Sequence, residues 1–443
     1  MKKILLLGAG RSSTILIEYL KKECENNDWQ LIVADQDKEV IEEKTRGSDR
    51  CIPLQVHNVV DELDSLLPDM QLVISMLPAS LHIKIAHKCV ANKVNLLTAS
   101  YVSDEMNQLD SQVKEAGLLF MNECGLDPGI DHMSGVKVLD RLREEGWTIH
   151  GFETFTGGLL APSNEDNPWH YKFTWNPRNV VMAGQGGVKF FQEGRYKYIP
   201  YHRLFTRTEV VHIPGFGYFE GYANRDSLKY REIYGLEDIQ TMYRGTFRRP
   251  GYCKTWDIFV QLGATDDSYE LEDVASMTHR DFINTFLFYN PSDSVELKLA
   301  HYMKIEMESE EMYKLKWLGV FEQEPIGLDK GTPAQVLEHI LKKKWTLNDT
   351  DNDMIVMWHK FNYHKGDGHM KEYHSTMVAL GEDKVNTGMA KTVGLPMGIV
   401  AKLMLQDKIS LKGVHIPIHG EIYNPVLKEL EELGFHFIEE EID

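Results

Sequence analysis

The chain has few cysteines, no long apolar run and no excess of positive charge. Only five of its 443 residues are cysteine, and none stands in a CxxC pair or another metal-type spacing. The odd number and wide dispersal of these residues indicate free thiols in a reducing compartment. No stretch reaches the roughly 20 consecutive apolar residues that a membrane-spanning helix needs. The formal net charge of −19 argues against nucleic acid or an anionic membrane surface as the main partner.

Neither a secretion signal nor a metal site is expected. The apolar N-terminal run stops at Gly10 and meets Arg11, which is short for a signal peptide, and no small-residue cleavage site follows. Among the 18 histidines, His364, His369 and His374 lie near one another without a good ligand spacing, so no metal is predicted. These features predict a cytoplasmic protein that binds neither nucleic acid nor membrane.

Five short apolar runs in the first 145 residues alternate with segments of helical periodicity. Runs of this length suit strands buried on both faces, and strands alternating with helices are typical of a parallel, doubly wound sheet. We therefore predict an α/β fold with an N-terminal Rossmann-type sheet. The predicted strands are Ile4–Leu7, Leu31–Ala34, Leu72–Ser75, Val94–Thr98 and Leu118–Met121.

The composition changes at about Thr148, where glycine, proline and aromatic residues become frequent. Short alternating runs such as Val210–Ile213 indicate an antiparallel or mixed sheet. Met354–Tyr363 and His369–Leu380 indicate a β-hairpin, with its turn at Lys365-Gly366-Asp367-Gly368.

The predicted architecture has three parts. Residues 269–347 follow a helical pattern, and a last long helix is expected at about 386–406. The predicted domains are a dinucleotide-binding domain at 1–130 with the C-terminal segment 386–443 packing back on it, a mixed α/β substrate and dimerisation domain at 131–265 and 348–385, and a small helical domain at 266–347.

A glycine-rich turn joins the first predicted strand to the first helix. Two glycines allow a tight turn and a close approach of the backbone to a pyrophosphate at a helix N-terminus. The usual third glycine is replaced by a serine, which is still small enough for close helix–strand packing. The residues predicted to bind the cofactor here are Gly8, Ala9, Gly10, Arg11, Ser12 and Ser13.

Asp35, at the end of the second predicted strand, bears on which cofactor binds. A carboxylate at this place hydrogen-bonds the ribose hydroxyls of NAD and repels a 2′-phosphate, and Gln36 stands where an arginine would pair with that phosphate. We predict that NAD is preferred and that NADP is the alternative; a solvated strand-end role for Asp35 is the competing interpretation. Topology alone places Leu77 and Pro78 near the nicotinamide.

The segment Asn122–His132 contains two glycines, a proline, a cysteine and four ionisable side chains in eleven residues. Glycine and proline interrupt regular structure, so we expect a loop between the run Leu118–Met121 and a helix over His132–Glu145. Loops at this place in α/β proteins bind ligands. The alternative is an ordinary turn with Asp131 as the helix N-cap.

Several segments together resemble the saccharopine dehydrogenase family, most closely its NAD(P)-dependent L-glutamate-forming type. The resemblance implies a nucleotide-binding domain, a mixed-sheet substrate domain and a helical domain. It also implies an oxidoreductase of lysine metabolism that interconverts saccharopine with L-glutamate and 2-aminoadipate 6-semialdehyde. The matching segments are Thr98–Ser103, Asn122–His132, Gly157–Pro162, Asp166–Pro168, Tyr171–Trp175, Asn224–Ser227, Arg244–Arg248 and Met389–Lys402.

The resemblance assigns roles to individual residues. Asp127 would pair with the substrate amine, and Tyr101 would donate a hydrogen bond to a carboxylate or to the departing water. Arg225, Arg244 and Arg248 suit a substrate with three carboxylates, because arginine binds carboxylates bidentately. The predicted saccharopine contacts are Ser100, Tyr101, Asp127, Asn224, Arg225, Arg244 and Thr246. The further residues predicted to lie against the cofactor are Leu126, Pro128, Thr174, Trp175 and Asn176.

Two positions depart from the family pattern. Thr156 stands where related enzymes often have a cysteine. The fungal members carry a basic residue beside the second strand and use NADP, whereas this chain has Asp35-Gln36. His132 and Cys124 are acid–base candidates by residue type, but we interpret both as structural.

Two other functions remain as alternatives. One is a related dehydrogenase acting on another amine–aldehyde adduct such as carboxynorspermidine, which the three arginines argue against. The other is a non-catalytic nucleotide sensor, which would be expected to lose polar residues such as Tyr101 and Asp127. A homodimer is predicted, because dimers are common in related folds.

Overall fold

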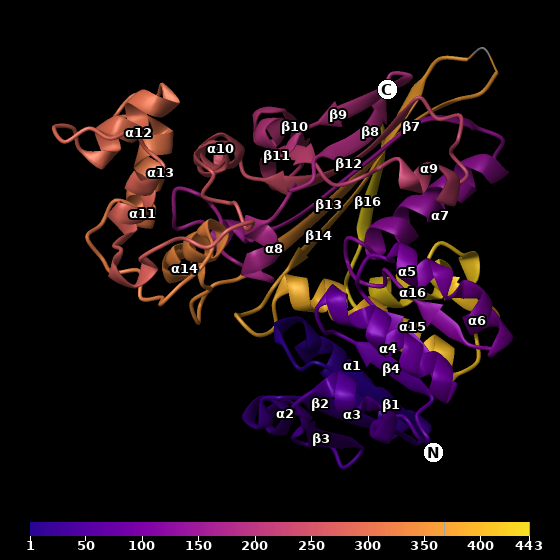
Figure 1. Cartoon of the computed structure of the whole chain (residues 1–443). Coiled ribbons are helices and arrows are strands. Elements are labelled where there is room, and N and C mark those ends of the chain that lie inside the picture. Colours follow the sequence, from indigo (N-terminus) through magenta and orange to yellow (C-terminus); the bar gives the residue numbers. More distant parts are fainter. Residues whose placement is uncertain (367, 443) are drawn as a thin grey trace. The chain divides into compact units, whose positions relative to one another are not determined.

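The computed structural model describes residues 1–366 and 368–442 (Figure 1). The chain divides into two compact units. Unit 1 contains Met1–Thr148 and Met377–Ile438, and unit 2 contains Ile149–Thr376 and Glu439–Asp443. The α/β fold class predicted from the sequence is confirmed by a parallel sheet in unit 1 and a mixed sheet in unit 2.

Unit 1 is built on a seven-stranded sheet in the order β15-β6-β5-β4-β1-β2-β3, and each pairing in it is parallel. Six of these strands follow the Rossmann order 3-2-1-4-5-6. All five strands predicted from apolar runs are present. The strands are β1 (Lys2–Leu7), β2 (Trp29–Asp35), β3 (Cys51–Gln55), β4 (Leu72–Ser75), β5 (Asn95–Thr98), β6 (Leu119–Met121) and β15 (Gly413–His415).

Two strands of this sheet, β3 and β15, were not predicted. β3 contains Pro53 and is mostly exposed, because it is an edge strand and has no continuous apolar run. β15 has only three residues and joins the opposite edge from a distant part of the chain, where it pairs with β6.

The helices of unit 1 begin with side-chain caps at several places, such as Asp37 before α2 and Asn58 before α3. The expected helix over His132–Glu145 exists as α7, but it begins at Ile130. Asp131 therefore lies in the first turn, so the alternative interpretation, which made Asp131 the N-cap, was wrong on that point; Gly129 holds that position. The helices are η1 (Arg11–Ser13), α1 (Thr14–Asn27), α2 (Lys38–Thr45), α3 (Val59–Leu66), α4 (Ala79–Asn92), α5 (Asp104–Gln108), α6 (Asp110–Glu115), α7 (Ile130–Glu144), α15 (Gly388–Leu405) and α16 (Gly420–Glu432).

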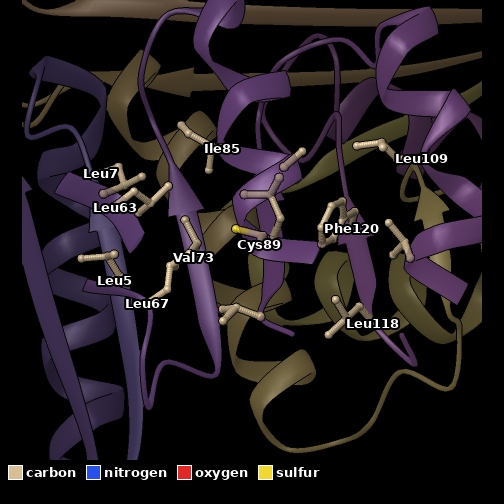
Figure 2. Close-up of a cluster of buried hydrophobic side chains, with 14 of the residues drawn as sticks. Leu5, Leu7, Leu63, Leu67, Val73, Ile85, Cys89, Leu109, Leu118 and Phe120 are labelled. Carbon is tan, nitrogen blue, oxygen red and sulfur yellow. The ribbon is translucent and has the colours of Figure 1, made fainter. Parts of the chain in front are cut away.

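Figure 2 shows one layer of the unit 1 core, where strand side chains meet helix side chains. Leu5 and Leu7 of β1 and Phe120 of β6 pack in the same cluster as Ile85 and Cys89 of α4. All five are fully buried. Each large apolar side chain buried in this way contributes about 1.5–3 kcal/mol to stability. This layer anchors the strands whose ends carry the candidate site.

α15 is long and apolar enough to pass a composition test for a membrane span, but 83% of it is buried inside the fold. It packs closely on α1, because two of its glycines face that helix. A Cβ atom at Gly394 would lie 2.8 Å from the backbone nitrogen of Leu16, and one at Gly398 would lie 2.5 Å from the Tyr19 ring. The apolar character of α15 is therefore explained by packing.

Unit 2 is built on a nine-stranded mixed sheet. Its main path runs β10-β11-β12-β7-β13-β14-β16, and β8 with β9 branches from β12. The predicted strands of the hairpin are present as β13 and β14, whereas Asp367 of the predicted turn lies outside the described residues. β16 was not predicted, because its sequence is acidic and exposed. The strands are β7 (Thr148–Leu160), β8 (Val188–Gln192), β9 (Arg195–Ile199), β10 (Thr208–Ile213), β11 (Gly217–Ala223), β12 (Thr241–Arg248), β13 (Asp353–His364), β14 (Lys371–Leu380) and β16 (Phe437–Ile442).

The helical pattern predicted over 269–347 is present as one short turn and four helices. Thr278 and Thr332 open two of these helices with complete capping boxes. The helices of unit 2 are η2 (Pro162–Asn164), α8 (Pro177–Val181), η3 (Tyr201–Thr206), α9 (Lys229–Ile233), α10 (Tyr252–Leu262), η4 (Val274–Ser276), α11 (His279–Thr285), α12 (Val295–Met303), α13 (Glu310–Leu318) and α14 (Pro333–Trp345).

The contact between α1 and α15 generates a prediction. Gly394→Ala should lower the free energy of unfolding by about 1–3 kcal/mol, because the new methyl group would press on the backbone of Leu16. The matched control is Gly420→Ala in α16, where the nearest atom to a new Cβ is the Asn424 amide nitrogen at 3.4 Å. Chemical denaturation of both variants is the measurement, and equal stability of the two would contradict the packing argument.

Candidate functional site

The glycine-rich turn follows β1 directly and leads into η1 and α1. Gly8 has a φ of +97°, and a Cβ atom there would lie 3.3 Å from the backbone of Met76, so this position requires glycine. A Cβ atom at Gly10 would meet nothing within 4 Å, which leaves the outer side of the turn open. Ser13 is buried and donates to the carbonyl oxygen of Gly10 at 2.7 Å, so it packs closely as predicted. The turn has room for a phosphate group.

Asp35 lies at the end of β2 and contacts this turn. One carboxylate oxygen accepts a hydrogen bond from the amide of Ala9 at 2.6 Å, and the other accepts from the amide of Asp37 at 3.1 Å. Gln36 is exposed and donates to the carbonyl oxygen of His57 at 3.0 Å. The half-buried Asp35 carboxylate therefore lies where a ribose would approach the turn.

Lys44 of α2 also contacts the turn, and the sequence analysis missed it. Its ammonium group donates to the carbonyl oxygens of Ala9 at 2.7 Å and Gly10 at 2.6 Å. Burial lowers the pKa of Lys44, whereas the nearby Asp35 carboxylate opposes that shift. By holding two carbonyl oxygens, Lys44 fixes the orientation of the peptide groups in the turn. No spacing rule connects a helix residue with this loop, so Lys44 could not be found from the sequence.

A second group of polar side chains lies at the ends of β4 and β5. Ser75 and Thr98 are paired in register as the last residues of these strands. The ring of His82 lies 3.0 Å from the Ser75 hydroxyl, 3.1 Å from that of Thr98 and 2.9 Å from that of Ser100. His82 is 5% exposed, and burial lowers its pKa to about 4. Leu77 follows this strand end and lies against Gly8, and its place near the nicotinamide stays a prediction.

The loop after β6 carries Asp127. Every residue from Leu118 to Val136 is buried except Asp127, which is half-exposed. The hydroxyl of Tyr101 donates to the Asp127 carboxylate at 2.9 Å. Leu126 and Pro128 on either side are buried. The predicted catalytic pair is therefore brought together within unit 1, with a single carboxylate reaching the surface of the loop.

A buried network of charged groups holds this loop. Glu123 accepts from the amide of Val102 at 2.9 Å, and its other oxygen lies 2.7 Å from the His132 ring. Asp131 accepts from the amide of Gly129 at 2.6 Å. Cys124 is fully buried, which raises the pKa of its thiol well above the ordinary value. The structural interpretation of His132 and Cys124 agrees with these contacts.

Unit 1 fits a dinucleotide. The turn after β1 leaves space on the outer side of Gly10, a carboxylate stands at the end of β2, and polar groups gather at the ends of β4, β5 and β6. In a doubly wound sheet, ligands bind outside the carboxyl ends of the strands.

Unit 2 presents a row of polar side chains on one face of its sheet. Arg244, Thr246 and Arg248 alternate along β12 and therefore share a face. Thr154 and Thr156 of β7 stand beside Arg244 and Thr246 in parallel register. The hydroxyl oxygens of both β7 threonines are buried and have no hydrogen-bond partner among the described residues. Buried hydroxyls without partners are costly, so this face is suited to a polar ligand.

Arg248 is the most unusual member of this row. It is 2% exposed, and its guanidinium carbon lies 4.9 Å from the ring centre of Tyr171, 5.8 Å from that of Tyr222 and 5.2 Å from that of Tyr252. One nitrogen donates to the carbonyl oxygen of Phe247 at 2.8 Å, and its Nε has no hydrogen-bond partner within 1–366 and 368–442. Cation–π contacts hold this side chain in place.

The charge of Arg248 is not balanced by a neighbouring acid in the described part of the chain. Glu220 is its register partner on β11, but the Glu220 carboxylate accepts from the amide of Cys253 at 2.6 Å. Burial raises the pKa of Tyr171 to about 12, so this tyrosine is neutral at pH 7. A buried cation without a counter-ion is expensive, and a bound anion would relieve that cost.

The other residues predicted on unit 2 lie in loops or at element ends. Arg225 is exposed with a φ of +53°, next to the half-buried Asn224, whose amide donates to the carbonyl oxygen of Arg244 at 2.8 Å. Arg244 is buried with its guanidinium carbon 4.6 Å from the Tyr230 ring centre. Asn176 caps α8 by accepting from the amide of Arg178.

Thr174 is buried, and its hydroxyl has no partner among the residues that the structure describes. Trp175 is half-exposed beside it. The roles predicted for these side chains remain predictions.

A family model described as the saccharopine dehydrogenase C-terminal domain matches residues 125–435, and one described as the saccharopine dehydrogenase NADP binding domain matches residues 4–121. The saccharopine dehydrogenase [NADP(+), L-glutamate-forming] of Saccharomyces cerevisiae is 30% identical, and the match covers 97% of both chains. The alpha-aminoadipic semialdehyde synthase of Rattus norvegicus is 33% identical over 98% of this chain.

The chain spans about half the length of the mammalian relatives it matches, covering 47% of the rat protein. A solved apo structure of the saccharopine dehydrogenase (L-Glu forming) from Saccharomyces cerevisiae is similar with a TM-score of 0.89 and 28% identity, over 100% of both chains. A homospermidine synthase from Legionella pneumophila shares the fold alone, with a TM-score of 0.53 and 10% identity.

These comparisons confirm the resemblance drawn from the motifs, and they support the prediction of a nicotinamide cofactor. They favour NADP, which the domain description and the names of the fungal relatives specify, over the predicted NAD.

Proposed function

Because this chain belongs to the saccharopine dehydrogenase family, we propose that it interconverts saccharopine with L-glutamate and 2-aminoadipate 6-semialdehyde. The observation that carries the proposal is Arg248, which is buried without an ion-pair partner among the described residues. It lies in a row with Arg244 and with the hydroxyls of Thr154 and Thr156, which have no hydrogen-bond partner within 1–366 and 368–442. Although the chain has a net charge of −19, it buries cationic side chains on one sheet face. Saccharopine carries three carboxylates that these cations would bind.

Each residue has a proposed role. A bound nicotinamide would supply or accept the hydride. In unit 1, Asp127 would pair with the substrate amine and hold it close to the nicotinamide, and the Tyr101 hydroxyl would keep the carboxylate oriented. In unit 2, Arg225, Arg244 and Arg248 would hold carboxylates. Positioning of this kind contributes several kcal/mol to a bimolecular step.

The reaction itself is tested with the purified protein. Saccharopine and NAD or NADP are supplied separately, nicotinamide reduction is followed by absorbance, and both organic products are identified. Formation of glutamate and aminoadipate semialdehyde supports the proposal. Turnover of carboxynorspermidine but not of saccharopine would show that the substrate is the polyamine adduct. No turnover of either compound would favour a nucleotide sensor.

Arg248→Met should raise the KM for saccharopine by about 10- to 100-fold, because one charge-assisted contact is worth about 1.5–3 kcal/mol. The Kd for the dinucleotide should not change. The matched control is Arg249→Met, since the neighbouring Arg249 is also buried but forms an ion pair with Glu165 at 2.5 Å. That control should lower stability and leave KM unchanged. Equal KM values for the two variants would show that Arg248 does not bind the substrate.

Asp127→Asn should reduce kcat by about tenfold or more, because the amide cannot stabilise a charged substrate amine. Dinucleotide binding, measured by fluorescence titration, should be retained. Asp104→Asn is the control, since Asp104 is exposed in the first turn of α5. Loss of both turnover and dinucleotide binding in Asp127→Asn would instead indicate that Asp127 maintains the loop.

For the cofactor we propose NAD, and Asp35 supports the proposal against the NADP named for the relatives. Asp35→Asn keeps an oxygen that accepts from Ala9 but removes the charge. It should shift the ratio of kcat/KM for NAD to that for NADP at least tenfold towards NADP. Asp37→Asn is the control, because Asp37 is an exposed cap of α2 two residues away. A wild-type protein that prefers NADP, or a ratio that does not move, would overturn this assignment.

The homodimer stays a proposal, since related folds form dimers, and light scattering on the purified protein tests it. The cytoplasmic location predicted from the free thiols is likewise a proposal; all five cysteines are buried and unbridged.

A further inference from the structure

His82 lies at a point where three hydroxyl groups meet. Its Nδ1 is 3.0 Å from the Ser75 hydroxyl, and its Nε2 is 2.9 Å from that of Ser100 and 3.1 Å from that of Thr98. Ser75, Thr98 and His82 are buried, whereas Ser100 is half-exposed. The network therefore begins inside unit 1 and ends at Ser100, a residue that is half-exposed.

The sequence brings these groups together through the sheet. Ser75 and Thr98 end adjacent parallel strands in register, so their side chains lie side by side. α4 begins at Ala79 after Pro78, which places His82 in the first turn of that helix, over the ends of both strands. The amide of Ser100 donates to the Thr98 hydroxyl at 3.2 Å, which holds the backbone of the next loop against the same ring.

The ring is neutral at physiological pH, because its pKa is lowered by burial to about 4. A neutral imidazole donates from one nitrogen and accepts at the other. It therefore offers one donor and one acceptor to the hydroxyl groups around it. A serine hydroxyl held in this way presents a set donor or acceptor to a ligand, whereas an isolated hydroxyl rotates freely.

We propose that His82 is a positioning residue that orients the Ser100 hydroxyl for the substrate. The proposal rests on the proposed function, in which Ser100 contacts saccharopine. His82 lies on α4, outside the motif loops, and its side chain acts through Ser100. Loss of the bond between His82 and Ser100 would weaken substrate binding and leave the dinucleotide turn after β1 untouched.

The test uses two variants whose side chains differ in length. A glutamine side chain can place its amide where Nε2 lies, near Ser100, whereas an asparagine side chain reaches only the place of Nδ1, near Ser75. His82→Asn should raise the KM for saccharopine about tenfold, and His82→Gln should stay within about threefold of wild type. The dinucleotide Kd should be unchanged in both. A merely structural role would lower the melting temperature of both variants and affect KM equally.

A double-mutant cycle with Ser100→Ala makes the test independent of folding effects. If His82 acts through Ser100, His82→Asn should raise KM no further once Ser100 is alanine. Fully additive effects, or equal KM values for the asparagine and glutamine variants, would overturn the inference. Failure of the proposed function is distinguishable, because the wild-type protein would then turn over no saccharopine at all.

Discussion

Parallel strands in one sheet have their carboxyl ends at the same edge, and unit 1 depends on this constraint. The glycine turn follows β1, Asp35 ends β2, and Ser75 and Thr98 end β4 and β5. Residues far apart in the sequence, such as Gly8 and Met76, therefore lie in one neighbourhood without any long loop having to reach it. The apolar core shown in Figure 2 packs the strands together, and this packing also positions the polar groups at the strand ends.

In unit 2 the important constraint is buried charge rather than strand topology. Two buried guanidinium groups share a face of β12 in a chain with a large acidic excess. Aromatic rings lie against both guanidinium groups in cation–π contacts. At Arg248, where no described acid forms an ion pair, the rings orient the cation without neutralising it, whereas an aspartate in the same place would fill the binding position. The cost of burying the charge is the reason to expect an anionic ligand.

Much of the fold could be predicted, because its elements carry strong local signals. The five predicted strands of unit 1 are continuous apolar runs, and the helical stretch after Tyr269 has clear periodicity. β3 and β15 could not be predicted, since an exposed edge strand with Pro53 and a strand of three residues have no local signature. Among candidate site residues, Asp127 and Tyr101 lay in unusual motifs, whereas Lys44 and His82 lie in ordinary helices. Their contacts arise only from tertiary packing.

The loop that carries Asp127 is buried and is held by hydrogen bonds within unit 1. Glu123 ties it to Val102, and Asp131 ties it to Gly129, both through buried carboxylates. Its backbone is also bonded to Thr98 and Ser100 on the neighbouring strand end. Asp127 is the one half-exposed residue of a long buried run, and Tyr101 already donates to it. A carboxylate held in place in this way loses little conformational entropy when a charged amine binds, so more of the interaction energy remains for binding. The buried charges around the loop thus affect function by holding one half-exposed carboxylate, that of Asp127, in position.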